Sequence, residues 1–163
     1  MMMLALHPKT VFLGQSVEYP GTAMTNTLAG VPKDRLLELP VAEEMQMGMS
    51  IGMALNGFIP VSIYPRWNFL LLAVNQLVNH LDKHPAMGYR PKVIVRTGIG
   101  SIRPLHPQHQ HVGDFTDAFR SMLTTVKVVR LEEPEEIFPA YQAALASEGS
   151  TLLIEYGDYH QEK

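Results

Sequence analysis

The sequence contains no cysteine, and this absence removes several classes of function. Disulfide scaffolds, thiolate nucleophiles and cysteine-based zinc or iron–sulfur sites all require that residue. The chain of 163 residues also has no run of basic residues, and its formal net charge is −3. Nucleic acids and anionic membranes bind through clustered positive charge, so we expect neither as a partner.

Long apolar runs and an amino-terminal signal are missing as well. Gly, Asn or charged residues interrupt every apolar stretch, and none approaches the ~20 residues of a membrane span. The amino terminus, MMMLALHPKT, is short for a secretory signal and has no charged start or small-residue cleavage site. These features favour a cytoplasmic protein, and the length predicts a single domain over 1–163.

Short β-branched or apolar segments alternate with longer helical patterns along the chain. The predicted strands are Thr10–Val17, Leu36–Leu39, Phe58–Tyr64, Lys92–Thr97, Val126–Leu131 and Thr151–Tyr156. The predicted helices are Pro40–Leu55, Trp67–Lys83, Phe115–Leu123 and Pro134–Ser147, and the predicted loops include Glu18–Asp34 and Gly98–Val112. This order predicts an α/β fold: a three-layer sandwich with a mostly parallel sheet, helices on both faces, and ligands beyond the carboxyl ends of the strands.

The helix predicted over Pro40–Leu55 contains the first candidate catalytic residue, Glu43. This carboxyl group lies at the start of an otherwise apolar helix, and in such low-dielectric surroundings it could hold or share a proton. The alternative is that Glu43 only complements the positive end of the helix dipole. Gly48 and Gly52, four residues apart, remove side chains from one stripe and allow another backbone to approach.

Two further segments contain candidate site residues. Aromatic rings cluster in Tyr64–Phe69, where a strand gives way to a helix; they could stack on a flat heterocycle or belong to the ordinary core. The loop Pro104–Val112 contains His106, His109 and His111. A metal site would need further ligands that the neighbouring sequence does not signal, so a polar loop near a ligand is favoured over a histidine metalloprotein.

Together these segments resemble a known family. The stretch Arg35–Gly57, RLLELPVAEEMQMGMSIGMALNG, resembles the transketolase-like pyrimidine-binding domain of thiamin-diphosphate enzymes. That domain occurs in transketolases and in beta subunits of 2-oxoacid dehydrogenases, and the beta subunits are more similar. The segments NGFIPVSIYPRWNFLLLAVNQLVNHLDK and KVIVRTGIG, and then the pair Gln110-His111, match later parts of the family in the same order.

The resemblance implies roles for three residues. Glu43 matches the glutamate that hydrogen-bonds a ring nitrogen of the cofactor's aminopyrimidine and favours the imino tautomer, which removes the thiazolium C2 proton. Phe69 matches the aromatic residue that packs against the pyrimidine, and His111 matches a histidine near the substrate. The implied function is the pyrimidine-binding subunit of an oxidoreductase or transferase that acts on a small 2-oxo acid or ketose.

The family's motif for holding the diphosphate through magnesium is missing. That motif is Gly-Asp-Gly followed later by Asn, whereas Gly113-Asp114 and Gly157-Asp158 precede Phe and Tyr here. We therefore expect the diphosphate-binding domain and the carboxy-terminal transketolase-type domain to be absent from this chain. The resemblance implies that a partner chain carries the diphosphate domain and most of the Mg²⁺ ligands in an α2β2-type hetero-oligomer. The Gly48/Gly52 helix is expected at or near its interface.

A second interpretation is a non-catalytic scaffold or regulatory subunit. The presence of Glu43 argues against it, because a buried carboxylate costs stability unless it is paired. Arg66, Arg96 and Arg103 are cationic candidates for binding a substrate carboxylate or phosphate, although structural roles are equally open.

Overall fold

The strands assemble into one parallel sheet. The computed structural model describes residues 1–100 and 108–156. Within them, the strands pair in the order β2-β1-β3-β4-β6-β5, and each of these pairings is parallel. The strands are β1 (Thr10–Gly14), β2 (Leu36–Glu38), β3 (Ile59–Ile63), β4 (Ile94–Ile99), β5 (Lys127–Arg130) and β6 (Thr151–Tyr156). This arrangement confirms the predicted α/β fold.

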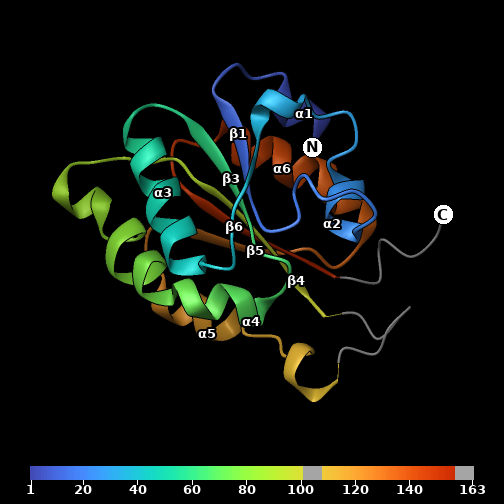
Figure 1. Ribbon diagram of the computed structural model, residues 1–163. Helices are drawn as coiled ribbons and strands as arrows, with labels where there is room; N and C mark the ends of the chain where they lie inside the picture. The colour runs from blue at the N-terminus through green and yellow to red at the C-terminus, as the bar shows by residue number, and fades with distance from the viewer. Residues whose placement is uncertain (101–107, 157–163) are drawn as a thin grey trace.

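Helices cover both faces of the sheet (Figure 1). One face packs against α3 (Glu43–Leu55), α4 (Trp67–Leu70) and α5 (Thr116–Met122), and the other against α1 (Met2–Ala5), α2 (Ala23–Thr27) and α6 (Ile137–Ala146). Each face has its own buried cluster. Val95 of β4 belongs to the cluster under α3, whereas Ile94 belongs to the cluster under α6. Alternate side chains of a doubly buried strand thus serve two cores.

Several helical segments differ from the prediction. Instead of one helix over Trp67–Lys83, α4 is followed by a 3-10 turn, η2 (Leu71–Ala73), and a π-helix, η3 (Gln76–Leu81). The predicted loop Glu18–Asp34 includes α2, and α1 was not predicted at all. Helices of four or five residues are too short for an apolar period to reveal them.

The remaining short turns are η1 (Lys33–Arg35), η4 (His84–Met87), η5 (His109–His111) and η6 (Pro134–Glu136), the last leading directly into α6. Among the described residues, no helix has the length and apolar character needed to cross a membrane.

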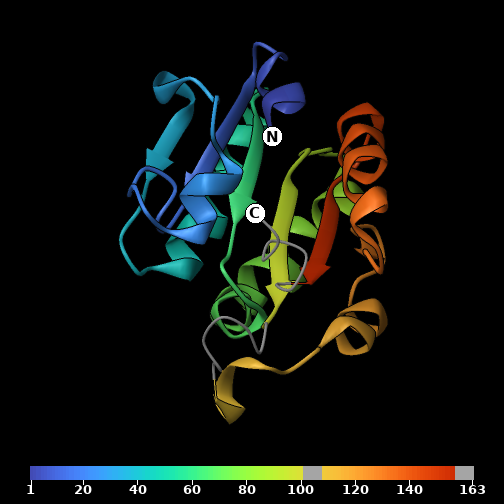
Figure 2. The ribbon, with the colours of Figure 1, turned by 90° about the vertical axis from the view of Figure 1, so that its right-hand side faces the viewer.

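The strand order reverses beside β1. Since β2 lies on one side of β1 and β3 on the other, the connections after β1 and β3 leave in opposite directions. Open parallel sheets bind ligands at such a point, beyond the carboxyl ends of the strands. In Figure 2, β4 and β6 point towards the edge of the molecule where the turn η5 lies. A ligand-binding site is therefore expected at this edge of the sheet.

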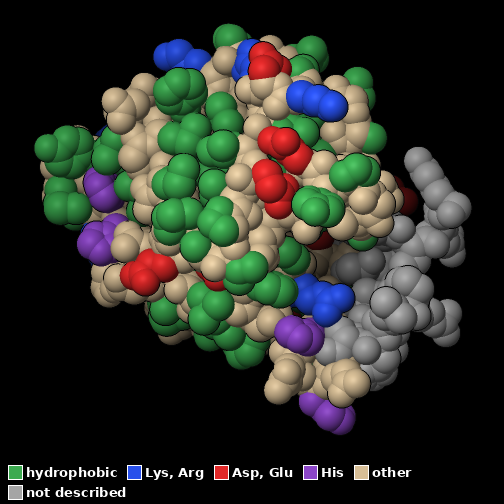
Figure 3. Space-filling view, viewed as in Figure 1, with side chains coloured by type: hydrophobic (Ala, Val, Ile, Leu, Met, Phe, Trp, Pro, Cys, Tyr) green, Lys and Arg blue, Asp and Glu red, His purple; other side chains and the backbone are tan. Residues whose placement is uncertain are grey.

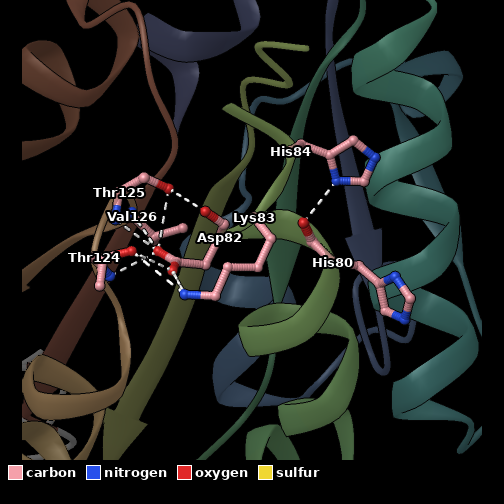
Figure 4. A network of polar contacts seen from close by, with 7 residues as sticks. All are labelled: His80, Asp82, Lys83, His84, Thr124, Thr125 and Val126. Atoms are coloured by element: carbon pink, nitrogen blue, oxygen red, sulfur yellow. Dashed lines mark hydrogen bonds and ion pairs between the residues drawn. The ribbon is translucent and has the colours of Figure 1, made fainter. Parts of the chain in front are cut away.

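A buried carboxylate joins the end of η3 to the start of β5 (Figure 4). Asp82 accepts hydrogen bonds from the backbone N–H groups of Thr124 (2.9 Å), Thr125 (2.7 Å) and Val126 (3.0 Å). The Nζ atom of Lys83 lies 2.9 Å from its other oxygen. Burial alone would raise the pKa of Asp82, but the hydrogen bonds from Lys83, Val126 and Thr125 hold it well below its usual value.

We expect Asp82→Asn to lower the free energy of unfolding by about 2 kcal/mol near neutral pH, because charge-assisted hydrogen bonds become neutral ones. The folded-state pKa lies below the unfolded value of about 3.9, so this stabilisation is complete above that value and is lost as the pH falls below it. Urea denaturation of wild type and variant at pH 7, 5 and 3 measures the difference.

The control for this substitution is Asp117→Asn, since Asp117 is almost fully exposed and pairs with Arg120 at the surface. That change should alter stability by a few tenths of a kcal/mol at most. A stability difference for Asp82→Asn that is the same at pH 7 and pH 3 would contradict the proposed role of the charge.

Candidate functional site

The first part of the candidate site is the beginning of α3, which lies over the carboxyl ends of β1 and β3. The side-chain amide of Gln46 donates hydrogen bonds to the Ile63 carbonyl (3.0 Å) and the Ser62 hydroxyl (3.1 Å). A Cβ atom on Gly14 would lie 2.3 Å from the same carbonyl oxygen, so a side chain there would push β1 away from β3. These contacts hold the helix start at the reversal point of the sheet.

Glu43 is buried at this helix start with a carboxylate oxygen that lacks a partner. The residue is 6% exposed, and its Oε1 atom has no hydrogen-bond partner among the described residues. The Tyr64 hydroxyl donates to the backbone carbonyl of Glu43 (3.3 Å). Burial raises the pKa of Tyr64 above its ordinary value, so this hydroxyl stays protonated. A buried carboxyl oxygen without a partner is costly unless a ligand satisfies it.

The second part is an aromatic pair at the same edge. The rings of Phe69, on α4, and His111, on η5, have centroids 6.3 Å apart and planes inclined by 12°. Both residues are partly exposed, whereas the Nδ1 atom of His111 is buried without a partner in the described part of the chain. Such rings can stack on a flat heterocycle, and the imidazole nitrogen can exchange a hydrogen bond with a ligand.

The structure places the three predicted site residues at one edge of the sheet. The rings of Phe69 and His111 lie side by side and nearly parallel. Glu43 is linked to Tyr64, which begins the connection from β3 to α4 and so leads to Phe69. Their roles toward a cofactor or substrate stay predictions.

The histidine loop is only partly described. His109 is exposed, and His106 lies outside the described residues. Residues 1–100 and 108–156 contain no group of three His, Asp or Glu side chains that could hold a metal ion.

Arg96, one of the three arginines considered for anion binding, is already paired. Its guanidinium donates to both carboxylate oxygens of Glu155 (3.1 and 2.7 Å) and to the Thr27 hydroxyl on α2 (2.7 Å). Burial opposes the charge, but Glu155 holds the pKa of Arg96 above its ordinary value. This network lies under α2, on the opposite face of the sheet from α3. Arg66 is partly exposed at the start of α4, and Arg103 lies outside the described residues.

Two residues that position the site were not predicted from the sequence. Gln46 is a buried polar residue in an apolar helix, and that contrast is a signal that could have identified it. Gly100 follows β4, and a Cβ atom there would lie 1.8 Å from the carbonyl oxygen of His111. A glycine directly after a buried strand is a weaker signal, because many turns contain one.

Comparison with known families and sequences agrees with this geometry. Residues 2–156 match the family described as the transketolase pyrimidine-binding domain. The pyruvate dehydrogenase E1 component subunit beta of Staurastrum punctulatum is 26% identical over 155 residues, which are 91% of this chain and 46% of that protein. Subunit beta-4, chloroplastic, of Oryza sativa subsp. japonica is 30% identical over 91% of this chain and 38% of its own length. The chain thus spans less than half the length of these relatives.

Solved structures share the fold at low sequence identity. A split-gene transketolase, described as an inactive beta4 tetramer, matches with a TM-score of 0.72 and 18% identity over 93% of this chain and 46% of its own. The transketolase of Campylobacter jejuni matches with a TM-score of 0.71 and 15% identity over 90% of this chain and 22% of its own. At these identities the likeness establishes the fold.

The unpartnered oxygen of Glu43 predicts a stability cost in the isolated chain. We expect Glu43→Gln to raise the free energy of unfolding by about 1 kcal/mol, because a neutral amide is less costly to bury than a carboxylate. The melting temperature should rise by about 2–4 °C. Glu44→Gln, an exposed neighbour in the same helical turn, controls for the lost helix-dipole interaction. Equal stability of the two variants would show that burial of Glu43 carries no cost.

Proposed function

Because this chain belongs to the transketolase pyrimidine-binding domain family, we propose that it is the pyrimidine-binding subunit of a thiamin-diphosphate-dependent enzyme. The substrate class is a 2-oxo acid or a ketose. One observation carries the proposal above all: the Oε1 atom of Glu43 is buried at the reversal point of the sheet without a hydrogen-bond partner among the described residues. Folding does not require that arrangement, and a ligand would explain it.

The residues present fit the aminopyrimidine ring of thiamin diphosphate. The Oε1 atom of Glu43 would hold or share a proton with a ring nitrogen, which would supply the partner that this atom lacks among residues 1–100 and 108–156. Phe69 would pack against the ring, and His111 would present its unpaired imidazole nitrogen to the substrate. The bound cofactor supplies the carbanion chemistry, whereas these side chains bind it, orient it and hold the proton.

A partner chain is part of the proposal. We propose that another chain contributes the diphosphate-binding domain and most of the Mg²⁺ ligands, whose Gly-Asp-Gly motif followed by Asn does not occur in these 163 residues. Relatives are named as beta subunits, and one matching structure is a split-gene transketolase. An α2β2-type assembly, in which two copies of this chain meet, is the arrangement we propose, and the split-gene transketolase structure, a beta4 tetramer, shows that beta chains of that protein associate with each other.

The outward face of α3 supports a contact between copies. Figure 3 shows hydrophobic side chains gathered over the region of α3 and α4, with few charged ones among them. The outward side of α3 has one charged residue, Glu44, in the first turn of the helix. The apolar side chains on this side are exposed or half-buried: Met45, Met49, Met53 and Leu55. A helix surface that faces water is normally polar, so this face is suited to an interface.

The two glycines of α3 lie on that outward face and are not required by the chain's own packing. A Cβ atom on Gly52 would meet no atom within 4 Å, and one on Gly48 would meet only the Gln76 side-chain oxygen at 4.0 Å. Glycine inside a helix costs about 1 kcal/mol relative to alanine. Close approach of another backbone would explain that cost. A second copy brings the same small residues to the contact, and the face is too sparsely charged to repel itself.

Catalysis can be tested by replacing Glu43 in the complete enzyme. The chain is purified from its source under gentle conditions together with any stoichiometric partner, and the complex is then rebuilt with variant chains. Glu43→Gln should assemble normally but lose turnover by about 100-fold or more, as expected for a lost proton-transfer group. Glu44→Gln should retain turnover. Full turnover in the Glu43→Gln complex would support the alternative of a scaffold or regulatory subunit.

The interface can be tested separately with Gly52→Leu. A Cβ atom there meets no atom within 4 Å outside the backbone of its own helix, so we expect the variant to fold, with self-association weakened by about 10-fold or more. Light scattering after size-exclusion chromatography, over a range of protein concentrations, measures the molar mass and so the degree of self-association. Gly149→Leu is the matched control, because a Cβ atom there is also unobstructed but lies away from α3. A wild-type chain that stays monomeric at all concentrations would rule out the contact.

A further inference from the structure

The segment that contains His111 is held against the sheet from one side by backbone packing. Gly100, just after β4, allows the carbonyl of His111 to approach so closely that a Cβ atom would lie 1.8 Å away. Gly113 packs in the same manner on the ring of Phe115, 2.7 Å from where its Cβ would be. The chain between His111 and Phe115 therefore has little room to adjust on its own.

Asp114 fixes the other side of this segment through both carboxylate oxygens. Oδ1 accepts hydrogen bonds from the backbone N–H and the hydroxyl of Thr116, at the start of α5. Oδ2 accepts one from Nη1 of Arg130 at 2.8 Å. The side chains of Asp114 and Arg130 are 29% and 30% exposed, so water weakens this ion pair only in part.

Arg130 is itself held in one orientation at the end of β5. Its Nη2 atom donates to the hydroxyl of Tyr156 at the end of β6, and its Nε atom lies 3.0 Å from a carboxylate oxygen of Glu132. The guanidinium carbon lies 5.1 Å from the centre of the Tyr156 ring. A planar guanidinium with several fixed partners gives a defined direction to its contact with Asp114, which a flexible lysine would not.

We propose that Arg130 and Asp114 are positioning residues, which fix the turn η5 so that the His111 ring stays parallel to Phe69. Asp114 is three residues beyond His111, and the tight packing of Gly113 between them passes a displacement of one to the other. The value of this arrangement for the reaction rests on the proposed function of His111. The geometric claim stands without it, because it concerns the chain alone.

The test uses proton–carbon NMR of the full chain with its histidine signals assigned, the His111 signal by its loss in His111→Gln. Stacking on Phe69 should shift the His111 ring protons away from the values of exposed histidines such as His109. Asp114→Asn keeps an oxygen for Thr116 but removes the charge that faces Arg130, and Arg130→Gln removes the opposite charge. Both should lose most of the His111 shift, and Arg130→Lys should restore part of it.

The matched control is Arg120→Gln, which removes a surface ion pair with Asp117 (3.1 Å) on α5 by the same change of charge. It should leave the His111 signal as in wild type. Fluorescence of Trp67, the single tryptophan, reports folding, since its ring packs edge-on to Phe115 at 6.2 Å and against Phe119 at 4.7 Å. If Arg130→Gln does not fold, Arg130→Lys and Asp114→Asn still decide the question.

Wild-type His111 shifts in Asp114→Asn and in Arg130→Gln would overturn the proposal and leave the ion pair a purely structural contact, even if the melting temperatures fell. An equal His111 change in Arg120→Gln would overturn it too. Failure of the proposed function has a different signature. In that case the NMR signal of His111 would change in Asp114→Asn and Arg130→Gln as expected, but the complete enzyme would show no thiamin-diphosphate-dependent turnover. With turnover present, Asp114→Asn should lower kcat/KM about 10-fold, and Arg130→Lys should recover part of it.

Discussion

The close approach of β1 to β3 at their carboxyl ends determines where the start of α3, and with it Glu43, lies. It depends on Gly14, whose missing side chain leaves room for the Ile63 carbonyl. Gln46 uses that same carbonyl to anchor α3. Glu43 lies almost one turn earlier on the helix, so its position follows from a backbone contact between two strands. A rigid parallel sheet can hold a carboxyl group in this way without any direct partner for it.

The buried polar groups discussed for the two faces of the sheet differ in how completely they are hydrogen-bonded. Under α2 and α6, Arg96 and Glu155 form a bidentate pair, and the Tyr141 hydroxyl adds a hydrogen bond to Glu155. Burial raises the pKa of Tyr141 well above its ordinary value, so that hydroxyl remains a donor. On the α3 face, one Glu43 oxygen and one His111 nitrogen lack partners within the described residues. In structural polar networks, the buried donors and acceptors typically all have hydrogen-bond partners. The unsatisfied atoms of Glu43 and His111 lie at the carboxyl end of the sheet, where a ligand is expected.

The sequence predicted the sheet and the helices α3, α5 and α6 because these elements have strong local patterns. The apolar run of β3 and the thirteen-residue α3 are examples. The sequence pattern does not distinguish the π-helix over Gln76–Leu81 from an ordinary helix, since both have apolar residues at nearly the same spacing. Glu43, Phe69 and His111 were identified because their positions matched a family pattern, and the structure brings them to one edge.

The supporting contacts could not be predicted in the same way. Asp114 and Arg130 are sixteen residues apart in the sequence, and Gly100, after β4, approaches His111 on η5, a separate element. Neither pair produces a periodic pattern along the chain, and only the folded topology brings its members together. Local propensity and hydrophobic period report on elements of secondary structure. Contacts between elements, which give a site its precision, depend on tertiary packing.

Under the proposed function, α3 has two tasks that constrain each other. Its first turn holds Glu43 at the reversal point of the sheet, and its outward face, with Gly48 and Gly52, is suited to another chain. A helix anchored by Gln46 moves as a rigid body, so a subunit that packs on the outer face would also restrict the position of Glu43. Assembly and cofactor chemistry would then depend on one helix. This coupling gives a physical reason for a subunit to keep both an unpaired buried carboxylate and an exposed apolar face, each of which has a cost in the isolated chain.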